Sequence, residues 1–149
     1  MDLSTVADAL ALRYAASNIT PPAGLKTITT STARPPNAIP NTPFVITWPT
    51  EGDVTITPGR MAGEHTFMVT FYYSKAEADI PREYVALEKW LGVLLAATFP
   101  QMQLGLAPLV LKAIPLKWEI GSHVYAGITY EGITLTVHVW TSEPVTLVP

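Results

Sequence analysis

The chain has 149 residues, of which 48% are hydrophobic and only 14% are charged, and its length is typical of one domain. This composition excludes an intrinsically disordered chain, which needs many charges and few apolar groups. The 12 acidic residues outnumber the 9 basic ones, for a net charge of −3, and this argues against a protein that grips nucleic acid through its phosphates. With no cysteine in the sequence, a disulfide framework and thiolate chemistry are also excluded.

The N-terminal third is expected to hold a helix, a short strand and a proline-rich arm. Leu3–Ala16 carries apolar residues three and four positions apart, which predicts a helix, with Asp2 as its N-cap or first-turn acid. Leu25–Ser31 is rich in threonine and predicts a short strand. The segment 32–43 contains four prolines, which cannot lie inside a sheet, so we expect an extended arm there.

The next part of the chain alternates apolar and polar residues, as half-buried strands do. Phe44–Trp48 and Val54–Thr57 are expected to be strands, with a turn at Glu51–Asp53 between them. We expect Pro58–Gly63 to be a loop and Thr66–Tyr73 to be the following strand.

Ile80–Phe99 is expected to be the longer helix, and Pro100 ends it because proline cannot continue the hydrogen-bond ladder. Its apolar residues form a stripe that Trp90, Val93 and Ala97 widen, so we expect the helix to be covered on more than one side. The stripe consists of Tyr84, Leu87, Leu91, Leu94, Leu95 and Thr98.

The last third is expected to be a three-stranded antiparallel meander. Its predicted strands are Val110–Ile120, Val124–Tyr130 and 133–139, with turns at Gly121-Ser122 and Glu131-Gly132. Pro115 lies inside the first of these strands, so that strand is expected to lie at a sheet edge or to contain a bulge.

This order of elements predicts a single α+β domain over residues 1–149. We expect a mainly antiparallel β-sheet with two helices packed on one face, plus the proline-rich extended arm at about 32–43. The strands have one strongly apolar face and one threonine-rich face, as expected when helices cover only one side.

The sequence predicts no catalytic, cofactor-binding or metal-binding residues, and we do not expect an enzyme. The histidines His65, His123 and His138 have neither the spacing nor the acidic or cysteine companions of a zinc site. We therefore interpret each as a surface or structural histidine.

Six residues are candidates for a subunit interface. Arginine offers planar hydrogen bonding to a neighbour, and aromatic residues beside short polar ones are typical of interfaces. The alternatives stay open at this point: solvated loop arginines, and a sheet face that simply meets solvent. The candidates are Arg34, Pro35, Pro36, Arg60, Tyr125 and Trp140.

The order of elements resembles that of the tail terminator (tail completion) proteins of long-tailed bacteriophages. The likeness lies in Val6–Tyr14, in Thr20–Leu25, and in the start of the arm at Ser31–Pro36. It continues in the strand His65–Tyr73 and in the helix through Trp90-Leu91. The resemblance extends over nearly the whole chain as a pattern, and it carries over no residue with a known role.

The resemblance implies a structural virion protein. Such proteins form a ring, typically hexameric, at the head-proximal end of the tail tube, where they stop tube polymerisation and join the tail to the head. The implied partners are further copies of this chain, the tail tube protein and the head-side connector or stopper protein. DNA only passes through the lumen, no membrane is involved, and assembly takes place in the host cytoplasm.

Two other functions remain open from the sequence. One is another phage neck or tail part, a stopper or a tube protein, although the long helix argues against a tube protein because those are mostly β-structure. The other is a small ligand-binding domain or enzyme of α+β type, which would need a pocket with convergent polar groups.

Overall fold

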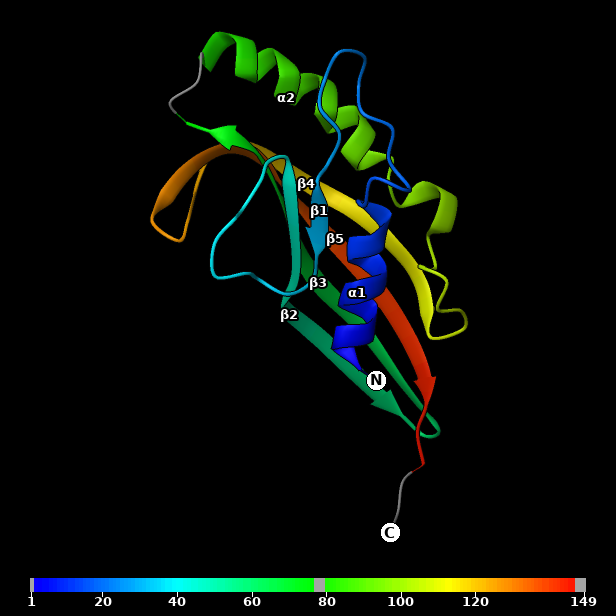
Figure 1. The fold of residues 1–149 in the computed structure, drawn as a ribbon. Coiled ribbons are helices and arrows are strands. Elements are labelled where there is room, and N and C mark those ends of the chain that lie inside the picture. The colour runs from blue at the N-terminus through cyan, green and yellow to red at the C-terminus, as the bar shows by residue number, and fades with distance from the viewer. Residues whose placement is uncertain (1, 77–79, 147–149) are drawn as a thin grey trace.

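The computed structural model describes residues 2–76 and 80–146, which form one five-stranded sheet in the order β1-β2-β3-β5-β4 with helices against it (Figure 1). The elements in chain order are α1 (Leu3–Arg13), β1 (Thr30–Thr32), β2 (Phe44–Thr57), β3 (Arg60–Lys75), α2 (Ile80–Leu95), a 3-10 turn (Phe99–Gln101), β4 (Val110–Tyr125) and β5 (Ile128–Pro144).

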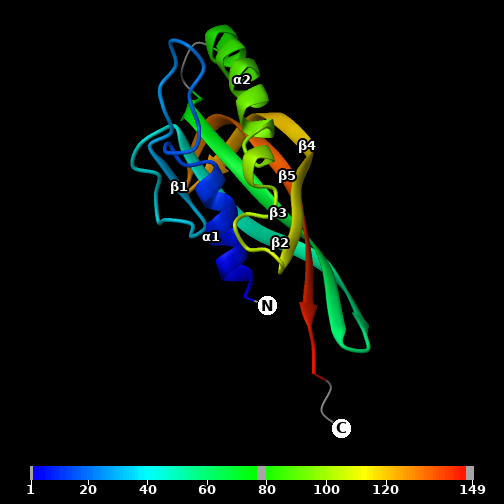
Figure 2. The same cartoon turned by 90° about the vertical axis from the view of Figure 1, so that its right-hand side faces the viewer.

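The sheet is antiparallel except where the short β1 runs parallel to β2. Both helices lie on the same side of it, as Figure 2 shows. The predicted α+β class is thus confirmed. We call the side under the helices the helix face and the other side the second face.

The main core lies between the helices and the helix face. Alternate residues of the strands point into it, because successive strand side chains point to opposite faces. The rings of Phe71 on β3 and Trp90 on α2 lie 4.9 Å apart at its centre. Other buried members are Val6, Leu10, Val69, Leu87, Leu94, Ile133, Leu135 and Val137.

Helix α1 begins as predicted and ends earlier than predicted. The Asp2 carboxylate accepts a hydrogen bond from the Ser4 backbone N–H at 2.9 Å, which satisfies a free donor of the first turn. The Ser4 hydroxyl also donates to this carboxylate at 2.6 Å, and this bond, together with the backbone one, lowers the pKa of Asp2. The helix stops at Arg13 rather than Ala16, and the Asn18 side-chain amide donates to the Leu12 carbonyl at 2.8 Å in place of a further helical turn.

Helix α2 also ends earlier than predicted, at Leu95 rather than Phe99, and the chain tightens into a 3-10 turn around Pro100. Leu87 and Leu94 of the predicted stripe are fully buried, but Tyr84 is 50% exposed. In the described part of the chain, neither helix is long and apolar enough to cross a membrane.

Strands β2 and β3 form a longer hairpin than predicted. The turn expected at Glu51–Asp53 is wrong, because β2 continues through it after a bulge between Pro49 and Glu51. The loop expected at Pro58–Gly63 shrinks to a two-residue turn, Pro58-Gly59, in which Gly59 has a φ of 81° that glycine adopts at little cost.

The predicted C-terminal meander is wrong, because β4 and β5 form one long hairpin. Its turn is Ala126-Gly127, where both residues have positive φ, 50° and 80°, as in the turns that match strand twist. Gly121 and Gly132, expected in separate turns, pair directly across the ladder.

Two expectations about sheet edges have different outcomes. The strand with Pro115 lies at the edge, and it contains a bulge between Pro115 and Lys117, so this prediction is confirmed. At the opposite edge, the strand expected at Leu25–Ser31 is only Thr30–Thr32.

Candidate functional site

The edge strand β4 presents an apolar row to solvent. Among the described residues β4 pairs with β5 only, so its outer side is open. Two β-bulges interrupt the pairing of β4 with β5, one at Leu111 and one at Leu116. In the described chain, neither leucine has a partner on β5, and both are exposed. Bulges re-aim side chains and are common at sheet edges. Here each bulge carries a leucine, and the same edge also carries Pro115 and lysines, which limit unspecific edge pairing.

The second face of β4 carries basic groups. The Lys112 ammonium lies 4.5 Å from the centre of the Trp140 ring on β5, a cation–π contact. Lys117 forms an ion pair with Glu119 at 3.1 Å, and both of these side chains are well exposed. The register places Lys112 and Lys117 on the same face of the strand, because the bulge between them restores the alternation.

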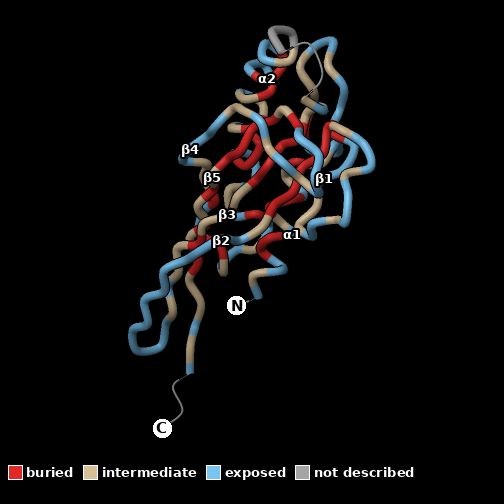
Figure 3. The backbone as a smooth tube through the Cα atoms, turned by 90° about the vertical axis from the view of Figure 1, so that its left-hand side faces the viewer, coloured by how far each residue is buried: buried red, intermediate tan, exposed pale blue. Residues whose placement is uncertain are grey.

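The tip of the β2–β3 hairpin projects beyond the core, as the exposed colouring in Figure 3 shows. Its two faces differ. On the helix face Val54 and Ile56 are 53% and 60% exposed. On the second face lie the acidic residues Glu51, Asp53 and Glu64, because Asp53 pairs with Glu64 and Glu51 with Thr66.

His65 is buried at the root of this hairpin. Its ring lies where side chains of Gly52 and Gly63 would otherwise stand, and its Nε2 shares a hydrogen bond with Thr141 Oγ1 at 3.2 Å. Burial lowers its pKa, and the charge of Glu143 opposes that shift. The imidazole thus fills the gap left by two glycines and packs the projecting hairpin against β5.

His138 lies on the second face near the same end of the sheet. It is bonded to Glu64, with 2.7 Å between His138 Nδ1 and Glu64 Oε1, and its ring lies 5.8 Å from that of Trp140. In the residues that the structure describes, no three His, Asp or Glu side chains are placed to hold a metal ion.

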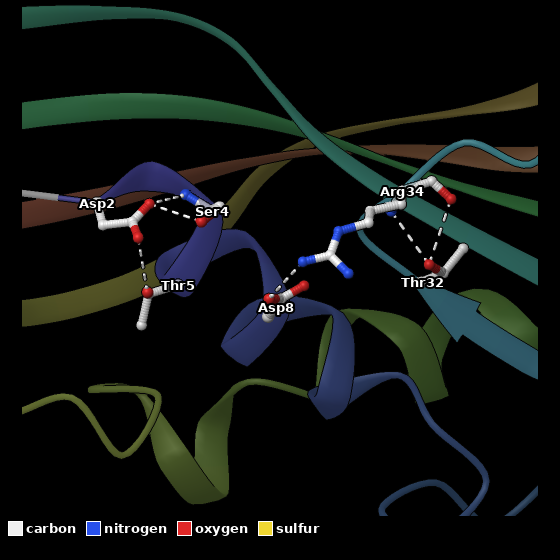
Figure 4. Close-up of polar contacts among 6 residues, drawn as sticks. All are labelled: Asp2, Ser4, Thr5, Asp8, Thr32 and Arg34. Carbon is white, nitrogen blue, oxygen red and sulfur yellow. Dashed lines mark hydrogen bonds and ion pairs between the residues drawn. The ribbon is translucent and has the colours of Figure 1, made fainter.

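The proline-rich arm packs against its own chain. Ile39 contacts a small cluster on the second face, which consists of Phe44, Ile46, Tyr72 and Tyr130. The Tyr125 hydroxyl donates to the Pro36 carbonyl, and the Tyr125 ring lies 5.6 Å from that of Tyr72. At the start of the arm, Arg34 reaches Asp8 of α1 at 3.8 Å (Figure 4).

The six predicted interface residues fall into two groups at opposite ends of the sheet. Arg34 and Pro35 are exposed on the arm, next to Pro36 and its partner Tyr125. Arg60 lies at the tip of the β2–β3 hairpin, where its Nε–H donates to Ser142 Oγ at 3.0 Å, and Trp140 lies four residues before Pro144, the strand partner of Arg60. Their role at an interface stays a prediction.

The sequence analysis missed the most exposed apolar residues. A signal for the β4 leucines was present: the adjacent apolar pairs Val110-Leu111 and Pro115-Leu116 break the alternation that a regular strand would show. Val54 and Ile56 were recognised as strand residues, but alternation gives no information on whether a helix covers that part of the strand.

A cavity of about 590 Å³ is open to solvent. It lies between the start of α2, the end of β3 and the loops before β1 and β2, and its polar lining includes Lys26, Ser74, Glu83 and Lys89. The Ser74 hydroxyl donates to Glu83 at 2.7 Å, so these two groups already satisfy each other.

No protein-family model and no curated protein matches this sequence. What the chain does is therefore inferred from its own residues and their geometry.

Proposed function

We propose that this chain is a tail terminator of a long-tailed bacteriophage. It is a structural subunit that forms a ring, typically a hexamer, at the head-proximal end of the tail tube. The ring stops tube polymerisation, joins the tail to the head-side connector and lets DNA pass through its lumen. The chain acts in the virion without catalysis or a cofactor.

The observation that carries this proposal is the presence of two separate exposed apolar surfaces, one toward each edge of the sheet. Apolar side chains stand in solvent on the β2–β3 hairpin at Val54 and Ile56, and on the β4 edge at Leu111 and Leu116. Extended exposed apolar surface marks a contact site. Two different contact surfaces on one subunit lead to head-to-tail assembly, which closes into a ring when the rotation allows.

The charge of the chain fits a DNA conduit. The net charge is −3, and the second face carries acidic groups at Glu51, Asp53 and Glu64 beside the basic Lys112 and Lys117. A lumen that bound phosphates through basic groups would hold DNA in place by releasing its counterions. An acidic subunit lets the DNA pass.

The test is native mass spectrometry of the purified chain over a concentration series, with negative-stain images of the same samples. The chain is then added to tail tubes of the same virus while they elongate. We expect closed rings with a central hole, and tubes that stop growing with a ring at one end.

Other outcomes would reassign the chain. Rings that bind the head connector but leave tube growth unchanged would indicate a stopper. A chain that stays monomeric and binds neither tubes nor connector would contradict the proposal, and the 590 Å³ cavity would then be the first place to look for a small ligand.

A further inference from the structure

The sheet ends in two long open edges, one on each side. Strand β2 pairs with β1 only at Phe44–Ile46, and in the described chain its remaining residues to Thr57 pair with β3 alone. Strand β4 pairs with β5 alone over its whole length in the same described residues. An open strand edge offers N–H and C=O groups for pairing with another chain.

The strand directions make these two edges compatible. Each neighbour from β2 through β3 and β5 to β4 is antiparallel to the last, so β4 runs antiparallel to β2. A second copy moved sideways, without being turned over, brings its β2 next to this β4 in an antiparallel pair. The helices of both copies then lie on the same side of a continuous sheet.

The side chains of the two edges are complementary on both faces. On the helix face, Val54 of β2 would lie level with Val110 at the start of β4, next to the exposed Leu111. On the second face, the acidic Asp53 would meet Lys112, while Lys117 is already paired with Glu119. Opposite charges across strands stabilise a pair, and like charges destabilise it.

The register supports this charge match. One row across the sheet runs Asp53, Glu64, Trp140 and Lys112, so Asp53 of an unshifted neighbour lies level with Lys112. Moving the neighbour along the strand by two residues places its Glu51 opposite Lys117 instead. By contrast, two β2 edges would bring the acidic Glu51 and Asp53 together.

We propose that the β4 edge is occupied by a second copy of this chain, whose β2 residues 51–54 add to the sheet beside the start of β4. This deepens the proposed function, because it assigns the contact on which the ring rests. The contact is head-to-tail, so each subunit uses both of its edges once.

The chain contains no cysteine, so an engineered disulfide tests the contact cleanly. In the double variant Asp53→Cys, Lys112→Cys the two thiols of one subunit lie at opposite edges of four strands, about 14 Å apart at the usual strand spacing. A disulfide needs Cα atoms within about 7 Å. Any disulfide between these two positions therefore joins two different subunits.

We expect oxidation of the double variant to give a ladder of covalent multimers on non-reducing gels, ending at the ring. The single variants alone stay monomeric on the gel, and mixing them gives dimers and nothing larger. The control pair Ala96→Cys with Lys112→Cys places one thiol on an exposed position just beyond α2, and it gives no ladder.

Three results would overturn the inference. A dimer from Lys112→Cys alone would mean that β4 pairs with itself. Rings seen by native mass spectrometry with no ladder would place the contact elsewhere and leave the proposed function standing. A chain with neither rings nor cross-links has no such contact, and binding of that chain to tail tubes then decides the proposed function separately.

Charge reversal gives a second, independent readout. We expect Asp53→Lys alone and Lys112→Glu alone each to weaken ring formation at least tenfold in the concentration required, and the combined variant to recover most of it. Thermal melting of each variant shows that the subunit itself is intact. Weakening without recovery in the combined variant would contradict the pairing of these two edges.

Discussion

Two glycines that face each other on β4 and β5 have unlike surroundings. A Cβ on Gly132 would collide with the carbonyl oxygen of Phe71, whereas a Cβ on Gly121 would meet nothing within 4 Å. The β3 backbone comes this close beside its own irregularity between Tyr72 and Ser74. Glycine is therefore required at position 132 and optional at 121.

We expect Gly132→Ala to lower the free energy of unfolding by about 1–3 kcal/mol, the usual cost of forcing an extra group into a packed site. Gly121→Ala is the matched control, and it should change stability by no more than about 0.5 kcal/mol. Urea denaturation of both variants measures this. Equal effects would mean that β3 moves away freely and that the close approach is not fixed.

The buried His65 makes stability depend on pH. Burial holds its pKa below the ordinary 6.5, so the unfolded chain takes up a proton more readily than the folded one. Stability is then greatest above pH 6.5 and is lost as the pH falls through the folded-state pKa. Burial lowers the pKa of His123 as well, which adds to the loss in the same direction.

We expect His65→Gln to lose less unfolding free energy than the parent chain between neutral and acidic pH. Glutamine does not titrate, and it can keep a hydrogen bond to Thr141. Denaturation at several pH values on both sides of 6.5 measures the difference. If parent and variant had identical pH profiles, the acid sensitivity would belong to other groups.

Among the secondary-structure elements, α2 shows that residues of one predicted hydrophobic stripe can differ in burial. We expect Leu94→Ala to cost about 2–5 kcal/mol, because Leu94 is fully buried against the sheet. Tyr84 was assigned to the same stripe but is half exposed, so Tyr84→Ala should cost less than about 0.5 kcal/mol. Thermal or urea melts of the pair decide this, and similar losses would place Tyr84 in the core.

The strands could be located from the sequence, but their turns could not. Alternation marks Phe44–Trp48 and Thr66–Tyr73 correctly as parts of strands. The glycines at 52, 121 and 132 were taken as turn residues because glycine is common in turns. They serve close packing or lie within ladders instead, and only the contacts of the fold reveal which.

For the whole molecule, substitution of an exposed leucine tests the proposed assembly without disturbing the fold of the subunit. We expect Leu111→Lys, at the β4 bulge beside Lys112, to abolish ring formation while leaving the melting temperature of the subunit unchanged, because Leu111 is already 52% exposed. Leu12 on α1 is 57% exposed and lies on neither edge, so Leu12→Lys is the control that keeps assembly. Analytical ultracentrifugation measures both variants, and rings from Leu111→Lys would exclude this bulge from the contact.

The sequence predicted the fold class and the helix-covered face, because both follow from apolar periodicity. It did not predict which surfaces stay open. That depends on where the helices end: α1 starts at Leu3 and extends over only part of β2, leaving the hairpin tip uncovered. The interface candidates on the arm were chosen for their composition, while the packing of Pro36 against Tyr125 is a long-range contact that local patterns do not encode.

The bulges of β4 and β2 have a consequence for fidelity. A regular edge accepts a partner strand equally well in many alignments, and so invites mispairing. Here the ladder skips at Leu111 and Leu116 on one edge and between Pro49 and Glu51 on the other. A partner strand in a shifted alignment loses hydrogen bonds wherever its backbone no longer matches a bulge. For the proposed contact between copies, these bulges therefore limit the alignments in which the two edges can pair.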